Sequence, residues 1–160
     1  VIEWVKFGKP SLVGIITGMV AGLATITPAS GFVGPLGGLC IGLAAGFVCY
    51  WAVGLVKSLW NIDDSLDVFA VHGVGGMLGT MMTGVFAVTV LGGGGLADGV
   101  GMGQQLGIQA TGVVATFVWS AVLTFVIVKV TVAVTGLRVS DDEITEGLDV
   151  TAHGESGYTL

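Results

Sequence analysis

Charged side chains are scarce in this chain: Asp, Glu, Lys and Arg make up 10% of its 160 residues. Soluble domains contain about 25% charged residues. Hydrophobic residues instead make up 53% of the chain, and 29 residues are glycine. This composition predicts an all-α membrane protein with several spans and argues against the soluble enzyme classes. The five Lys and Arg residues form no cluster, so nucleic acid is not an expected partner.

Cysteine is also rare. Cys40 and Cys49 are nine residues apart, which places them on opposite faces of a helix. They therefore predict neither a disulfide with each other nor a metal motif, and we expect no cofactor. The chain also starts without Met, and residues 1–5 resemble the end of an apolar segment. We therefore expect that an N-terminal part precedes it.

Long stretches without formal charge predict where the chain crosses a membrane. Residues 10–56 contain no Asp, Glu, Lys or Arg, which is long enough for two helices joined near Pro28 and Pro35. Two further uncharged stretches, 68–97 and 99–128, predict one helix each. We expect a transmembrane region over residues 1–135 and a separate tail over 136–160. Within the first, the predicted spans are 10–27, 34–56, 66–91 and 102–135.

The basic residues predict the orientation in the membrane, because cytoplasmic loops collect Lys and Arg. All five fall at the same predicted side of the bilayer: Lys6, Lys9, Lys57, Lys129 and Arg138. The loops 28–34 and 92–101 contain none. We therefore expect a multi-pass protein of the cell membrane with a cytoplasmic C-terminus. Three tryptophans fit an interfacial belt on that side: Trp4, Trp51 and Trp60.

Glycines recur every four residues within the predicted spans. Such stripes allow helix backbones to approach closely. We interpret them first as packing features of a tight helical bundle. The stripes are Gly14, Gly18 and Gly22; Gly38, Gly42 and Gly46; Gly75 and Gly79; and Gly99, Gly103 and Gly107.

His72 is the main candidate for function, because it is the only ionisable side chain deep inside a predicted span. Such groups face a bundle interior or a cavity and are functional candidates by default. The alternative is a neutral histidine that bonds a backbone carbonyl between packed helices. On a helix its neighbours are small or apolar, among them Val68, Gly75 and Gly76. This face favours a narrow apolar passage over a hydrated ion pore.

Asp67 lies at the start of the third predicted span. Its simplest role is structural, as a carboxylate favoured by the dipole at a helix N-terminus. A catalytic carboxylate would need a partner within the membrane, and the sequence contains none there. Ser120 also lacks the Gly-x-Ser-x-Gly setting of a serine hydrolase. We therefore do not expect an enzyme.

The sequence at the start of the acidic tail predicts a short helix. Ser140 followed three residues later by Glu143 is a capping box, which predicts a short helix over 141–146 that stops at Gly147. The tail is either a solvated segment or a docking element that ends near Tyr158, with Leu148 and Val150 as apolar contacts. We consider Ser140, Glu143, Gly147 and Tyr158 as candidate regulatory positions.

Several runs resemble the ammonium transporter family, Amt/Mep, in order and spacing along the whole chain. They are Gly-Lys-Pro-Ser-Leu at 8–12, Ile-Thr-Pro-Ala at 26–29, Asp-Asp at 63–64 with Asp-Val-Phe-Ala-Val-His-Gly-Val-Gly-Gly at 67–76, Gly-Leu-Arg-Val at 136–139, Glu-Gly-Leu-Asp at 146–149 and His-Gly-Glu at 153–155. The resemblance implies a homotrimer of eleven-helix protomers, each with its own pore. The chain resembles the C-terminal portion of such a protomer, from the end of the seventh helix onward.

The resemblance also implies a mechanism. His72 matches the second member of a histidine pair that lines a dry pore in this family. Ammonium would be deprotonated at the outer side, and ammonia would pass the histidines while the proton returns along them. Val68 would belong to the same pathway. The tail would lie against a neighbouring subunit and respond to a PII-type signal protein.

Three functions stay open at this point. The first is transport of ammonium or ammonia across the bilayer. The second is an ammonium sensor that signals through its tail without appreciable flux. The third is a channel for an unrelated small solute, which the residues around His72 disfavour.

Overall fold

The computed structural model describes residues 1–157, which fold into helices and connecting loops without a β-strand. The chain divides into two units, Val1–Ala115 and Thr116–Leu160. Within the described residues, four helical segments are long and apolar enough to cross a membrane. They are Leu12–Ala29, Pro35–Leu59, Phe69–Phe86 and Met102–Thr135. The predicted class, an all-α membrane protein with about four spans, is therefore confirmed.

The first unit begins with a short helix, α1 (Ile2–Phe7), which Gly8 ends in the left-handed conformation at φ 75°. Helix α2 (Leu12–Ile26) starts at Ser11, whose hydroxyl accepts a hydrogen bond from the Gly14 amide at 2.9 Å. The Glu3 carboxylate in turn accepts from the Ser11 amide at 2.7 Å. This contact ties α1 to the start of α2. A single 3₁₀ turn, η1 (Thr27–Ala29), follows α2.

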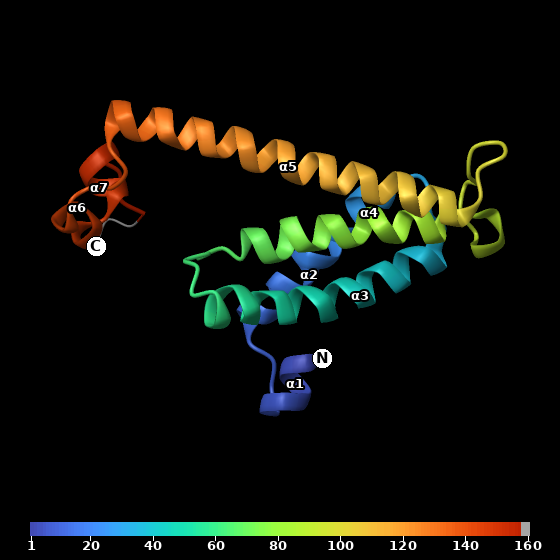
Figure 1. The fold of residues 1–160 in the computed structure, drawn as a ribbon. Coiled ribbons are helices and arrows are strands. Elements are labelled where there is room, and N and C mark those ends of the chain that lie inside the picture. Colours follow the sequence, from blue (N-terminus) through green and yellow to red (C-terminus); the bar gives the residue numbers. More distant parts are fainter. Residues whose placement is uncertain (158–160) are drawn as a thin grey trace. The chain divides into compact units, whose positions relative to one another are not determined.

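Helix α3 (Pro35–Gly54) starts on a proline, which lacks the amide hydrogen that a first helical turn leaves unpaired. It continues directly into a π-helical turn, η2 (Leu55–Leu59). The chain then forms a loop and enters a second π-helical segment, η3 (Phe69–Val74), which continues into helix α4 (Gly75–Phe86). The second and third candidate spans thus each contain a π-helical turn, one on either side of the same loop. Figure 1 shows this loop between α3 and α4.

The helix of the third span ends at Phe86, whereas the sequence predicted a span up to residue 91. Residues 89–91 form the 3₁₀ turn η4 (Thr89–Leu91) instead. The amides of Gly93 and Gly95 donate to the carbonyls of Val88 and Ala87, at 3.0 and 2.8 Å. The glycine run therefore folds back and satisfies carbonyls at the helix end, because glycine permits a backbone that other residues avoid.

Helix α5 (Met102–Thr135) is the longest element, and the boundary between the two units falls within it. The second unit continues with α6 (Asp141–Glu146) and α7 (Leu148–His153). The predicted tail helix over 141–146 is confirmed. Helix α7 was not predicted.

Helices α2, α3 and α4 of the first unit pack along one another through small side chains (Figure 1). One buried cluster joins Ala21, Cys49 and Val71, and a second joins Ala52, Val56 and Ala70. Small residues dominate because without a hydrophobic driving force helices associate in a bilayer through close packing.

Only some of the glycine stripes lie at close contacts within the described unit. A Cβ atom added to Gly75 would lie 2.7 Å from the Thr25 hydroxyl and 3.2 Å from the Cys49 sulfur. One added to Gly79 would overlap the Thr25 carbonyl. Added Cβ atoms in the middle of α2 and α3 would meet no atom within 4 Å, at Gly18, Gly22, Gly42 and Gly46. The tight packing predicted from the stripes is thus present where α4 crosses α2.

Candidate functional site

His72 lies inside the π-helical segment η3. Ala70 and Val71 of this segment are buried, whereas His72 is exposed in the described chain. Val68, one turn earlier, is also exposed, at 52%. The two residues assigned to a passage therefore both lie outside the packed core of the first unit. No hydrogen bond from the imidazole to another described residue is present.

The π-helical conformation changes the set of neighbours that α-helical spacing assigned to His72. A π-helix bonds residues five apart, so each such turn contains an extra residue compared with an α-helix. The Phe69 ring lies beside Gly73, where an added Cβ would approach it to 3.1 Å. Residues before η3 therefore point in directions that the periodicity of α4 does not predict.

Two carboxylates secure the start of η3. The Asp64 side chain accepts hydrogen bonds from the amides of Val68 and Phe69, at 2.8 and 2.9 Å. Asp67 adopts a left-handed backbone at φ 57°, and its carboxylate lies 2.7 Å from the Lys57 ammonium. Asp64 thus accepts the hydrogen bonds from the first amides of this segment, and Asp67 lies directly before Val68 at the helix start. The dipole role expected for Asp67 stays a prediction. Asp67 forms the only salt bridge of residues 1–157.

Sequence reasoning missed Asp64 and Lys57. Asp64 was detectable, because an acidic residue a few positions before a helix is a typical cap. The pairing of Lys57 was not, because it depends on how the loop between η2 and η3 folds.

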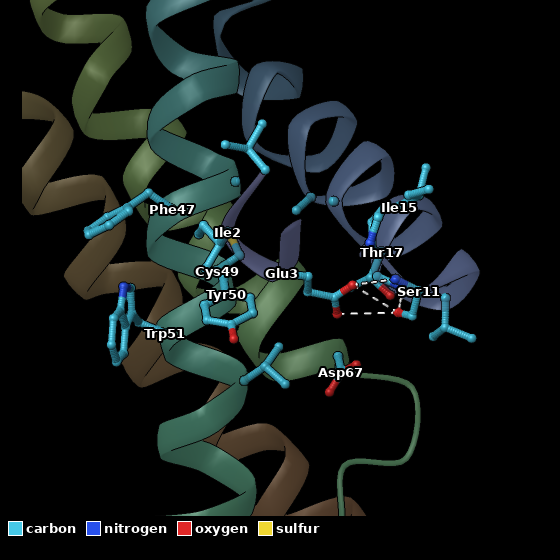
Figure 2. A pocket seen from close by; sticks show the side chains of 18 of the residues that line it. Ile2, Glu3, Ser11, Ile15, Thr17, Phe47, Cys49, Tyr50, Trp51 and Asp67 are labelled. Carbon is cyan, nitrogen blue, oxygen red and sulfur yellow. Dashed lines mark hydrogen bonds between the residues drawn. The ribbon is translucent and has the colours of Figure 1, made fainter. Parts of the chain in front are cut away.

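A cavity of about 740 Å³ opens between α1, α2 and α3 (Figure 2). Its lining is mostly apolar and includes Gly14 and Gly18 of α2 and Gly42 and Gly46 of α3. Polar side chains also contribute to the lining, namely Glu3, Lys6, Ser11, Thr17, Tyr50 and Asp67. The Lys6 ammonium lies 4.5 Å from the centre of the Trp51 ring, a cation–π geometry. His72 and Val68 are not among the lining residues, so the cavity and the histidine are separate features.

A metal site is not suggested by the described part of the chain, in which no three His, Cys, Asp or Glu side chains gather.

The capping box of the tail is present. The Glu143 amide donates to the Ser140 hydroxyl at 3.3 Å, and the Ser140 amide donates to the Glu143 carboxylate at 2.8 Å. The Ser140 hydroxyl also donates to the Glu143 carboxylate at 2.7 Å. The hydrogen bonds that this carboxylate accepts from the Ser140 hydroxyl and amide lower the pKa of Glu143. Gly147 ends α6 at φ 103°, a conformation that favours glycine.

Helix α7 exposes the apolar side chains predicted as docking contacts. Leu148 and Val150 are each 46% exposed, and Ile144 of α6 is 54% exposed. Gly154 caps α7 in the left-handed conformation, at φ 65°. This glycine directly after His153 was the sequence signal for α7 that was overlooked. Tyr158 lies outside the described residues.

Apolar helices of spanning length, packed through glycine and alanine and containing a single histidine in the third span, define a multi-pass membrane protein. The sequence profile of the Ammonium Transporter Family matches residues 1–158. The chain belongs to this family.

Curated relatives agree. The chain is 50% identical to an ammonium transporter of Aquifex aeolicus over 160 residues, which cover 99% of the chain and 37% of the relative. It is 42% identical to an ammonium transporter of Bacillus subtilis, with 98% of the chain and 39% of the relative covered. The chain thus spans less than half the length of these relatives.

A solved structure named "Sensor Amt Protein" matches with a TM-score of 0.84 and 33% sequence identity. The match covers 96% of the chain and 37% of that protein. The arrangement of helices is therefore shared with a protein that is named a sensor, whereas the relatives matched by sequence are named as transporters.

Proposed function

We propose that the whole protein conducts ammonium or ammonia across the cell membrane, and that this chain contributes His72 and Val68 to the passage. The observation that supports this most is His72 itself. It is the only Asp, Glu, His, Lys or Arg in the third candidate span, and it is exposed at the surface of the first unit. An ionisable side chain at such a position is stable only beside a cavity or another protein surface.

The chemistry of the site fits ammonium. A cation inside an apolar lumen costs several kcal/mol, so a proton is best removed before the nitrogen enters. A neutral imidazole both donates and accepts hydrogen bonds, and it therefore suits ammonia and a returning proton equally well. Val68 and Phe69, which lie close before His72 in the chain, are apolar and exposed, and an apolar lining favours neutral ammonia over the ammonium cation.

The orientation and partners form part of the same proposal. We place loops 57–65 and 136–160 in the cytoplasm, because the basic residues gather on that side. Family membership favours a homotrimer in the lipid bilayer, and the exposed apolar residues of α6 and α7 offer contacts for a neighbouring subunit or a PII-type protein.

The test uses the complete protein in proteoliposomes. His72→Ala is expected to change the ammonium current or its selectivity over potassium, since alanine neither donates nor accepts a hydrogen bond. His153→Ala is the matched control, because it removes the other histidine of the chain, which lies at the end of α7. Wild-type current and selectivity in His72→Ala would reduce His72 to a packing residue.

A second function, ammonium sensing without appreciable flux, is favoured by the similarity to the structure named "Sensor Amt Protein". The two functions differ in one measurement. Ammonium binding by the wild-type protein without any current in proteoliposomes supports sensing, whereas a current supports transport.

A further inference from the structure

The ion pair between Lys57 and Asp67 joins the two π-helical segments of the first unit. Lys57 lies in the middle of η2, and Asp67 directly precedes the first turn of η3. The pair is partly shielded from solvent, because the side chains are 41% and 16% exposed. Beneath it, Val56 of η2 and Ala70 of η3 belong to one buried cluster. The charge contact and the apolar contact therefore fix the same two segments against each other.

Asp67 occupies a backbone conformation that its neighbours must maintain. Its φ of 57° lies in the left-handed region, which side chains other than glycine avoid, although Asp tolerates it better than most. Its carbonyl accepts a hydrogen bond from the Val71 amide at 2.8 Å, so this residue starts the helical turn that ends one residue before His72. Strained conformations persist only where the surroundings determine them, and Lys57 is the one ion-pair partner of the Asp67 side chain in residues 1–157.

The π-helical turn decides where His72 points relative to α4. Each residue advances an α-helix by about 100°, so loss of the extra residue of a π-turn would rotate everything before it by about that angle. His72 would then leave the face on which it now lies. A contact that keeps the turn π-helical therefore also keeps the imidazole in place.

We infer that Lys57 and Asp67 are positioning residues. They hold the π-helical turn of η3 in register and thereby keep the His72 imidazole on the face where it now lies. The inference rests on the proposed role of His72 in the passage. According to this inference, selectivity also depends on two residues that lie outside the passage, Lys57 and Asp67.

The test compares four variants of the complete protein. Lys57→Met removes the charge and keeps the length of the chain, Asp67→Asn removes the other charge and tolerates a left-handed backbone, and the double variant removes both. Lys57→Arg keeps the pair. Lys129→Met is the matched control, because Lys129 lies in α5, where its ammonium is 5.5 Å from the Phe125 ring and forms no salt bridge in the described residues.

Two measurements are made on each variant. The first is amide hydrogen exchange over residues 68–74, which we expect to rise roughly tenfold in Lys57→Met and Asp67→Asn, because each leaves the partner charge unpaired. The second is the ratio of ammonium to methylammonium current, which we expect to fall by about fivefold in the same variants. Lys57→Arg should match the wild type in both. The double variant should lie closer to the wild type than either single variant, because no unpaired charge is left.

Unchanged exchange in Lys57→Met, relative to Lys129→Met, would overturn the inference. So would faster exchange with an unchanged current ratio, because the pair would then support the fold without aiming His72. A wild-type protein without ammonium current would count against transport, and the exchange measurement would still decide whether the pair holds η3. The two proposals can therefore fail separately.

Discussion

Gly79 offers the sharpest test of the packing. A Cβ atom at this position would overlap the Thr25 carbonyl oxygen, lie 2.9 Å from the Thr25 carbonyl carbon and lie 3.1 Å from Pro28. Two of these three atoms belong to the backbone of α2, so a change of side-chain rotamer cannot relieve the contact. Gly79→Ala must therefore separate α4 from α2.

The expected change in the free energy of unfolding of Gly79→Ala follows from two opposing effects. Alanine stabilises a helix interior by about 1 kcal/mol relative to glycine. Forcing an extra methyl group into a packed contact costs about 1 to 3 kcal/mol, and a backbone neighbour places the cost at the upper end. Gly79→Ala should therefore lower the free energy of unfolding by about 2 kcal/mol.

Gly76→Ala provides the control on the same helix, because an added Cβ there meets no atom within 4 Å. Its free energy of unfolding should stay level or rise by up to about 1 kcal/mol. Both values are measured by equilibrium unfolding of the detergent-solubilised protein. Equal stability of Gly79→Ala and wild type, or an equal loss in both variants, would refute the close contact between α4 and α2.

Four further predictions concern orientation and the tail. Cysteine placed at Gly94 should react with an impermeant reagent from the external side; reaction from the cytoplasmic side alone would reverse the orientation. Ser140→Ala should loosen α6, seen as faster amide exchange over 141–146, because the Glu143 amide loses its acceptor; unchanged exchange would mean that the cap contributes nothing. The wild-type helix should also loosen on acidification: because the folded pKa of Glu143 lies below its ordinary value of 4.5, its contribution is complete above that value and is lost as the pH falls through the folded pKa. Deleting residues 140–160 should leave the membrane helices assembled and alter activity or its response to a PII-type protein, measured as current with and without the partner, and a wild-type result in both would make the tail a solvated appendage.

Local patterns predicted the elements that local chemistry determines. Uncharged runs indicated all four candidate spans, because a helix that crosses lipid cannot contain many charges. The Ser140–Glu143 spacing predicted α6 and its cap, because both hydrogen bonds form within one turn.

The features that were missed depend on contacts between distant or folded segments. The hydrogen bonds that Asp64 accepts at the start of η3 were missed, because the loop before η3 turns through a left-handed residue, Asp67, that periodicity does not reveal. The π-helical turns η2 and η3 were missed for a similar reason, because hydrophobic periodicity does not reveal a single extra residue in a turn; their residues Val56 and Ala70 meet in one buried cluster. The role of His72 was proposed from its isolation in an apolar span, and its passage remains a prediction.

The length of α5 limits where the tail begins. Its 34 residues measure about 51 Å along the axis at 1.5 Å per residue, whereas the hydrocarbon layer is about 30 Å thick. A tilt of about 40°, the upper end of what membrane helices show, would still leave a vertical span of about 39 Å. Some turns of α5 must therefore extend past the acyl chains. The C-terminal end is the favoured side for this extension, because Lys129 lies near that end and its ammonium can then reach water. The acidic residues that follow then start among or beyond the lipid headgroups, at the depth where a water-soluble partner can reach them.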